Sequence, residues 1–447
     1  MIKIYNTLTK TLDEFKPINE KQVMMYVCGP TVYNYMHIGN SRPVIFFDTV
    51  ARFFRYLGYQ VTYVSNYTDI DDKIINRAKE EGISETAVSE KYIKEIEKTL
   101  RNLNCLPNEA NPKVTENMKG IINFIQLLIE KEGAYVVDGD VYFDVKKIPS
   151  YGQLSQQSIN NMLSGVRIDP NIRKRNPIDF NLWKETDEGM KWPSPWSMGR
   201  PGWHTECVVM INEIFKGKID IHGGGTDLKF PHHENEIAQA ECAFNHTIAN
   251  YWMHNGRIDL EGEKMSKSLG NVIWANDLLK LVNYQTYRLL ILNVPYRQPL
   301  VYRPELLEQS KNDFEKIYRA YLTLHRQIEL GKADEVEEDS EIKLIKEEFI
   351  GAMSDDFNTA NAITAIFKIV KISNNWLRDK NVKSGKLLFL KRVLEEMLWV
   401  LGMDITLEPL TKSDIELVNR WHQARKDKNF NLADSLRKEI NEKGIII

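Results

Sequence analysis

The sequence of 447 residues lacks the features that mark membrane, secreted and coat proteins. No apolar run approaches the roughly 20 residues that a membrane-spanning helix requires. Residues 1–17 include Asp13 and Glu14, which does not fit a secretory signal peptide. The 59 Lys and Arg residues nearly balance the 62 Asp and Glu residues, so a polybasic coat protein is excluded, although a local basic face is not.

Cysteine is also scarce, since the chain has only four, at positions 28, 105, 207 and 242. Four cysteines in so long a chain do not form a disulfide framework, and we therefore expect a reducing, cytoplasmic location. A free cysteine is usually a small buried hydrophobic residue, and we assign Cys105 and Cys242 to that role. Cys28 and Cys207 remain candidates for chemistry.

The chain has ordinary globular composition, with 43% hydrophobic and 27% charged residues, and its length predicts two to four domains. Short apolar segments alternate with helical periodicity up to about residue 110, which predicts a parallel sheet with helices on its faces. The pattern loosens between about 112 and 200, as in an inserted subdomain, and is almost entirely helical after about 303. The main predicted elements are strands at 21–28, 60–65, 141–145, 219–221 and 251–254, and helices at 42–57, from Lys73, 232–243, 415–426 and 432–443.

Several polar residues come at or directly after the ends of predicted strands: Cys28, Thr68 with Asp69, and residues 223–227. The carboxyl ends of parallel strands lie on one edge of a sheet, where ligands bind. We therefore expect these residues to share one cleft, although each of them alone also fits an ordinary turn.

His37, Ile38, Gly39 and Asn40 stand at the start of the first predicted helix. Free backbone amides at a helix start favour an anion such as phosphate, and Gly39 lets a ligand approach the backbone. The alternative is a plain helix cap, with Ser41 as the capping residue.

Two further segments carry candidates for nucleotide chemistry. The run 264–268 (KMSKS) places Lys264 and Lys267 between glycines, where two ammonium groups would stabilise a departing pyrophosphate more than a bound triphosphate. A solvated loop is the alternative. Asp227, after three glycines, fits either an acceptor for a ribose hydroxyl or ammonium group, or a helix cap.

A metal site is predicted from four scattered residues. His232 and Glu236 are neighbours on one helical face, whereas His233 would pair with Ile237. Together with Cys28 and Cys207 they form a donor set that suits Zn²⁺. The alternative for each cysteine is burial in the core, and Trp203, close to Cys207, fits either the core or a pocket wall.

Taken together, five segments resemble the motif set of the class I cysteinyl-tRNA synthetases, in order from residue 3 to about 358. They are MYVCGPTVYNYMHIGN, NYTDIDDK, PGWHTEC, HGGGTDLKFPHHENEIAQ and GEKMSKSLGN. The resemblance implies activation of cysteine with ATP and transfer to the 3′-terminal adenosine of tRNA(Cys). Asn40 departs from the commonest form of the first signature, which has a second histidine there; as a neutral donor it still suits a phosphate oxygen.

The resemblance also implies an α/β architecture. A Rossmann-like parallel-sheet catalytic domain (1–110 and 200–250) would carry an inserted connective subdomain (111–199). A stem-contact region with the KMSKS loop (251–302) would follow. The chain would end in an α-helical bundle that binds tRNA (303–405) and a small helical anticodon-binding module (406–447), in which basic residues lie among Trp421 and Phe430.

By similarity, His37, Gly39 and Asn40 would hold the ATP phosphates, with Mg²⁺, and Lys264 and Lys267 would follow the pyrophosphate. The resemblance also implies that Thr68 and Trp203 lie near the amino-acid pocket, and from its place after the glycines we expect Asp227 to contact the nucleotide. One Zn²⁺ per chain would be bound by Cys28, Cys207, His232 and Glu236, taking the substrate sulfur as a thiolate.

The partners implied are tRNA(Cys), L-cysteine and ATP, with no membrane, and a monomer is expected. Two other functions remain open from the sequence. One is a related cysteine ligase that transfers the adenylate to an amino sugar, and the other is a non-catalytic tRNA-binding relative. The long helical region after residue 303 favours tRNA over an amino sugar.

Overall fold

The computed structural model describes residues 1–156, 173–260, 272–331, 335–379, 381–443 and 445. The chain forms two compact units. The first consists of Met1–Leu281 with Tyr296–Tyr302, and the second of Val282–Pro295 with Arg303–Ile447. Within the described ranges, no helix has the length and apolar character needed to cross a lipid bilayer.

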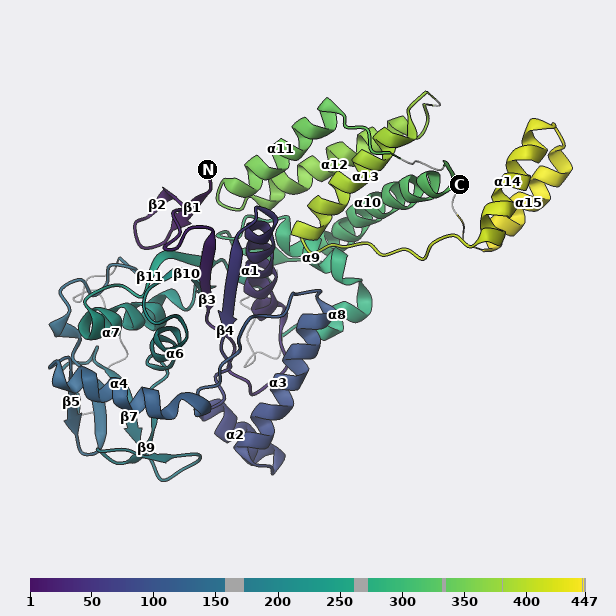
Figure 1. Cartoon of the computed structure of the whole chain (residues 1–447). Coiled ribbons are helices and arrows are strands. Elements are labelled where there is room, and N and C mark those ends of the chain that lie inside the picture. The colour runs from purple at the N-terminus through teal and green to yellow at the C-terminus, as the bar shows by residue number, and fades with distance from the viewer. Residues whose placement is uncertain (157–172, 261–271, 332–334, 380, 444, 446–447) are drawn as a thin grey trace. The chain divides into compact units, whose positions relative to one another are not determined.

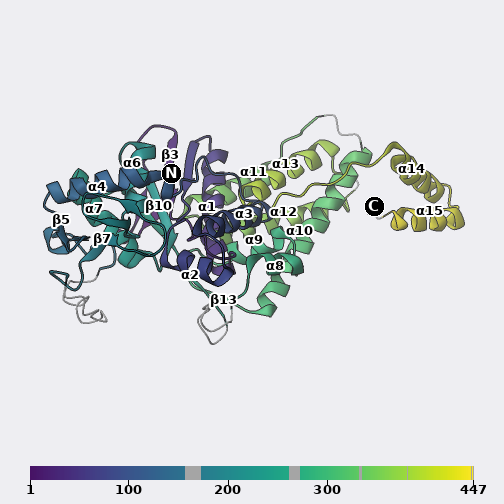
Figure 2. The same cartoon turned by 90° about the horizontal axis from the view of Figure 1, so that it is seen from below.

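The centre of the first unit is a four-stranded parallel sheet in the order β11-β10-β3-β4 (Figure 1). Helix α1 covers one face of this sheet, and α6 and α7 cover the other (Figures 1 and 2). The prediction of a parallel sheet with helices on its faces is confirmed. The elements are β3 (Gln22–Val27), α1 (Ile38–Tyr56), β4 (Gln60–Ser65), α6 (Glu206–Phe215), β10 (Ile219–Gly225), α7 (Glu234–Phe244) and β11 (Ala249–Asn255).

Two boundaries differ from the prediction in ways that shape the site. Helix α1 begins at Ile38 rather than Arg42, because the His37 side chain accepts a hydrogen bond from the Asn40 amide and caps the helix. Ser41 is therefore not the cap; it lies inside the helix and donates to the Ile38 carbonyl. Strand β10 continues through all three glycines, and a Cβ on Gly223 would lie 2.2 Å from the Phe47 ring of α1. Glycine there lets helix and strand pack closely.

The inserted segment forms an antiparallel five-stranded sheet in the order β5-β6-β7-β9-β8. Its buried residues share one core with α4, α6 and α7. The strand expected at 141–145 is β6 (Asp140–Phe143), which ends two residues earlier. The remaining elements of the unit are β1 (Lys3–Asn6), β2 (Thr11–Glu14), α2 (Asp72–Glu81), α3 (Glu85–Asn102), α4 (Met118–Glu130), β5 (Ala134–Val137), β7 (Phe180–Glu185), β8 (Trp192–Pro193), β9 (Met198–Pro201), β12 (Ile258–Leu260), α8 (Ala275–Leu281) and β13 (Leu300–Tyr302).

The second unit is helical, as expected. Helices α10 to α13 pack on one another, and the α14–α15 hairpin has its own small core around Trp421 and Ile440. Two side chains near that core, Phe430 and Leu432, are exposed. The helices are α9 (Tyr284–Leu292), α10 (Pro304–Gly331), α11 (Ser340–Ser354), α12 (Thr359–Trp376), α13 (Ser384–Val400), α14 (Lys412–Lys426) and α15 (Phe430–Glu442).

A buried ion pair fixes the chain after α3 against α1. Arg52 Nε donates to Asp48 Oδ2 at 2.9 Å, and the two side chains are only 1% and 4% exposed. The other oxygen of Asp48 accepts from the Leu106 amide at 2.8 Å, and Arg52 also donates to the Asn104 carbonyl at 2.7 Å. Each charge is thus hydrogen-bonded as well as paired, which burial of an ion pair requires.

We predict that Asp48→Asn destabilises the first unit by about 3–5 kcal/mol, because it leaves the Arg52 cation buried without its anion. Urea unfolding followed by circular dichroism measures the change. Glu188→Gln is the control: its ion pair with Lys79 spans 3.3 Å between exposed side chains, and its loss costs at most about 1 kcal/mol. Equal shifts in the two variants would contradict the prediction.

Candidate metal centre and its surroundings

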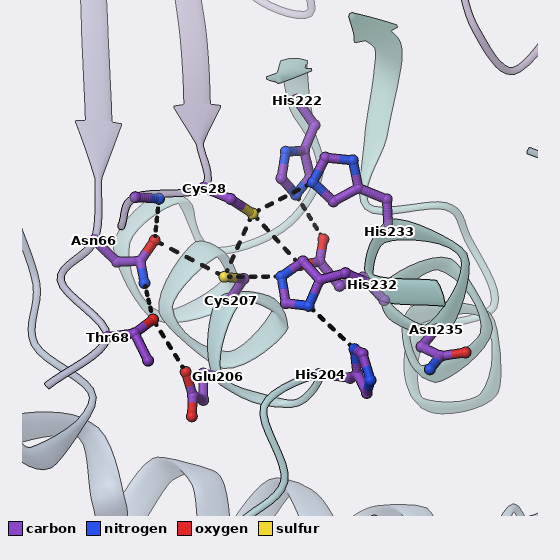
Figure 3. A network of polar contacts seen from close by, with 12 residues as sticks. Cys28, Asn66, Thr68, His204, Glu206, Cys207, His222, His232, His233 and Asn235 are labelled. Atoms are coloured by element: carbon purple, nitrogen blue, oxygen red, sulfur yellow. Dashed lines mark hydrogen bonds and ion pairs between the residues drawn. The ribbon is translucent and has the colours of Figure 1, made fainter. Parts of the chain in front are cut away.

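The four predicted metal ligands converge at the carboxyl edge of the central sheet (Figure 3). Cys28 follows β3, Cys207 lies in the first turn of α6, and His232 lies in a short π-helical turn, η3 (Lys229–His233). Glu236 lies in the first turn of α7. Cys28 Sγ is 3.6 Å from Cys207 Sγ and 3.7 Å from Glu236 Oε1. His232 Nε2 is 3.8 Å from Cys207 Sγ and 2.9 Å from Glu236 Oε1.

These separations fit a tetrahedral zinc site. Two sulfurs that are each ~2.3 Å from a tetrahedral Zn²⁺ lie about 3.8 Å apart, close to the observed spacing of Cys28 and Cys207. Cys207, His232 and Glu236 are 2%, 1% and 0% exposed. Two thiols, an imidazole and a carboxylate form a donor set that binds zinc in preference to harder cations.

The acid–base state of the cluster also favours a cation. Burial opposes ionisation of Glu236, but His222 and His232 outweigh it and hold the pKa of that carboxyl well below its usual range. The hydrogen bond from Cys28 lowers the pKa of the Cys207 thiol, against the effect of burial. Burial and the adjoining Cys207 raise the pKa of Cys28. One thiolate and one carboxylate are thus held ready at the centre.

Three further histidines surround these ligands, and the sequence did not single them out. His222 Nε2 lies 2.6 Å from Glu236 Oε2, and His233 Nε2 lies 3.4 Å from Cys28 Sγ. His233 Nδ1 lies 2.8 Å from His254 Nε2. Cys28, His222, His233 and Glu236 form a second set of potential ligands that shares two members with the first.

His233 lies directly before helix α7. Phe230 is extended, at φ −141° and ψ 132°, and the regular helix α7 begins at Glu234. His232 keeps its contact with Glu236 one turn later, and the adjoining His233 ring lies beside the rings of His222 and His254. For His254 a signal did exist, since it stands near the carboxyl end of β11, whereas His222 lies in the middle of the neighbouring strand β10.

A polar chain leads from the metal centre to Thr68. The Gly29 amide donates to Asn66 Oδ1 at 2.9 Å, and Asn66 Nδ2 donates to Thr68 Oγ1 at 3.2 Å (Figure 3). Thr68 Oγ1 donates to Glu206 Oε2 at 3.4 Å. A Cβ on Gly29 would lie 1.7 Å from the Asn66 carbonyl oxygen, so only glycine allows the two loops to meet. Asn66 and Glu206 were not predicted from the sequence.

Burial raises the pKa of Glu206 well above its usual value, and the neighbouring Cys207 adds to this effect. Trp203 stacks on the His232 ring, with centroids 4.3 Å apart and planes at 23°, and its side chain is 40% exposed. Trp203 is therefore a wall beside the metal centre rather than a core residue. Asp227 is exposed, and no side-chain cap precedes the η3 turn that follows it.

The start of α1 lies at the same sheet edge. His37 caps the helix and Asn40 is exposed. The Asn40 amide already donates to His37, but no acidic side chain stands in the first turn, so no carboxylate there repels an anion. The chain on both sides of His37 pairs with residues 273–275, since the Ile38 amide donates to the Ile273 carbonyl at 3.0 Å. Lys264 and Lys267 lie outside the described residues.

Comparison with known proteins gives concordant results. The family model described as "tRNA synthetases class I (C) catalytic domain" matches residues 14–312, and a DALR domain model matches 348–406. Cysteine--tRNA ligase of Geobacillus thermodenitrificans is 44% identical over 453 residues, which cover 100% of this chain and 97% of that protein. The protein of the same name from Finegoldia magna is 45% identical over 452 residues, with the same shares covered.

Solved structures share the fold at low identity. Methionyl-tRNA synthetase of Mycobacterium tuberculosis, in complex with methionyl-adenylate, aligns with a TM-score of 0.61 at 14% identity, covering 92% of this chain and 96% of that one. A putative arginyl-tRNA synthetase of Campylobacter jejuni aligns with a TM-score of 0.60 at 15% identity, covering 88% and 95%. The family match and the full-length identity together show that the chain belongs to the cysteinyl-tRNA synthetases, a family of class I aminoacyl-tRNA synthetases.

Proposed function

We propose that this chain, as a cysteine--tRNA ligase, selects its amino acid through one Zn²⁺ bound by Cys28, Cys207, His232 and Glu236. The observation that supports the proposal is the meeting of these four donors, from four separate elements, at spacings that fit tetrahedral zinc. A bound zinc ion would hold the substrate sulfur as a thiolate, which the hydroxyl of serine cannot match.

The protein's own side chains would supply the remaining discrimination. Trp203 would close the pocket beside His232, and Thr68 would offer a hydroxyl at its far side. Because a site built around a soft metal rejects serine by chemistry rather than by shape, a separate editing domain is not required.

For the nucleotide, we propose that the start of α1 binds the phosphates of ATP, accompanied by Mg²⁺. Gly39 would allow close approach of the phosphate, while His37 and Asn40 would donate hydrogen bonds to its oxygens. Lys264 and Lys267 would neutralise the charge that develops on the leaving pyrophosphate. Asp227, exposed after β10, would accept a hydrogen bond from a ribose hydroxyl.

For tRNA(Cys), we propose that the helices of 303–405 and the module of 406–447 form the binding surface. In the module, Arg425 lies over the Trp421 ring at 4.9 Å, and Phe430 is 67% exposed. Cationic and aromatic groups of this kind bind phosphates and stack on bases. The same proposal includes a monomeric state and a cytoplasmic location. It also includes the finer division of the first part of the chain into a catalytic domain (1–110 and 200–250), an inserted subdomain (111–199) and a stem-contact region (251–302).

Zinc dependence is tested by elemental analysis together with ATP–pyrophosphate exchange. The wild-type protein should contain one zinc per chain and exchange with cysteine but not with serine. Cys207→Ser should lose the metal and lower exchange more than about 100-fold. The expected effect is larger than the loss of a group that only supports a metal ligand, which costs up to about 100-fold. Cys242→Ser, which changes a half-buried cysteine away from the cluster, should retain both. Full exchange by zinc-free protein would refute the proposal.

The phosphate role of Asn40 predicts a selective effect on ATP. Asn40→Ala should raise the KM for ATP about 10-fold, the effect of losing one hydrogen bond to a charged group, and leave the KM for cysteine unchanged. Asn19→Ala, an exposed asparagine outside the sheet edge, is the control. An equal rise in both KM values for Asn40→Ala would point to misfolding instead.

The acceptor is tested by aminoacylation of a tRNA(Cys) transcript. We expect charging with cysteine, and no transfer of the cysteinyl group to glucosamine-based acceptors, because the second unit offers an RNA-sized helical surface. Replacing Arg425 by Ala should weaken charging through a higher KM for tRNA while leaving pyrophosphate exchange unchanged. Transfer to an amino sugar without tRNA charging would contradict the assignment.

A further inference from the structure

We propose that Glu206 and Thr68 together bind the α-ammonium group of cysteine, beside the metal centre that binds its thiol. The inference rests on the proposed function, since it takes the sulfur to be held at the metal. Glu206 thereby becomes a residue that determines specificity for an amino acid over other thiols.

The first argument is that the Glu206 carboxyl has few hydrogen bonds for a buried acid. Glu206 is only 1% exposed. Within the described part of the chain, its carboxyl accepts one hydrogen bond, from the Thr68 hydroxyl at 3.4 Å. No lysine or arginine of the described residues forms an ion pair with it. The ionised form of such a buried carboxyl is costly without a cation, and a bound ammonium group would supply that partner.

The neighbouring acids already have donors. Asp69 accepts from the Thr115 amide at 3.0 Å and from the Thr115 hydroxyl at 2.5 Å. Asp71 caps α2 through the Lys73 amide at 2.8 Å. Glu206 is therefore the acid in this group whose hydrogen-bonding capacity is largely unused.

The second argument is the orientation of the Thr68 hydroxyl. A threonine hydroxyl has one proton and two lone pairs. Its proton is directed to Glu206 Oε2, and Asn66 Nδ2 donates to one lone pair. Asn66 is itself fixed by the Gly29 amide. One lone pair of Thr68 thus remains to accept a hydrogen bond from an ammonium group.

The third argument is spacing. In cysteine, two carbon atoms separate the sulfur from the nitrogen. In the protein, Cys207 and Glu206 are adjacent residues at the start of α6. Asn66 contacts Cys207 Sγ at 3.9 Å and donates to Thr68 Oγ1 at 3.2 Å, and Thr68 in turn donates to Glu206 (Figure 3). One short series of contacts thus joins the proposed thiol site to the proposed ammonium site, as the short skeleton of cysteine requires.

This arrangement would give a selectivity that the metal alone cannot provide. A thiol-binding metal accepts any thiol of suitable size, including one without an amino group. The Glu206 carboxylate offers cysteine an ion pair that such a compound cannot form, so cysteine gains affinity from this residue and the other thiol does not.

The test compares L-cysteine with 3-mercaptopropionate, which has the same skeleton without the ammonium group. In the wild-type holoenzyme, the KM for cysteine and the inhibition constant of 3-mercaptopropionate are measured in pyrophosphate exchange. Glu206→Gln should raise the KM for cysteine at least about 10-fold, the effect of losing a charge-assisted hydrogen bond. The inhibition constant of 3-mercaptopropionate and the zinc content should not change.

Glu213→Gln, on the exposed side of the same helix, is the matched control and should alter neither constant. Should Glu206→Gln fail to fold, as judged by its thermal melt, Thr68→Val decides, with the same selective rise expected. Equal changes for both compounds, or none, in the folded variant would overturn the inference. Wild-type protein that contains zinc-free centres or shows no cysteine-dependent exchange would instead refute the proposed function.

Discussion

The structure of the first unit depends on a balance of charge among a few ionisable side chains that are buried together. Cys207, His232 and Glu236 are almost fully removed from water, and Cys28 joins them from the loop after β3. Such groups are costly to bury unless opposite charges and hydrogen bonds compensate them. The arrangement of loops after β3, before α6 and before α7 can be understood as the scaffold that makes this compensation possible.

Much of this scaffold follows from the sequence, because strand and helix periodicity are local properties. The parallel sheet, the helical second unit and the convergence of Cys28, Cys207, His232 and Glu236 were all predicted. These four candidates could be named because polar residues at strand ends converge in a parallel sheet, and because His232 and Glu236 keep the spacing of one helical face.

What the sequence did not predict depends on local backbone geometry or on contacts between distant segments. His233 lies beside Cys28, and its contacts with His222 and His254 join separate elements of the chain. The contacts of Asn66 with Gly29 and Thr68, and of Thr68 with Glu206, form only where the loops after β3 and β4 meet at Gly29. The early start of α1 arises from a histidine cap, and histidine is not among the residues that usually fill that position.

The separation of the ligands along the chain has a consequence for biosynthesis. Cys28 and Glu236 are 208 positions apart, and the inserted antiparallel sheet is made between them. During translation, the Cys28 thiol after β3 must therefore wait for its partners until most of the unit has left the ribosome. Uptake of the proposed zinc ion would then require a nearly complete nascent chain, and prematurely terminated fragments would not bind it through this set of donors.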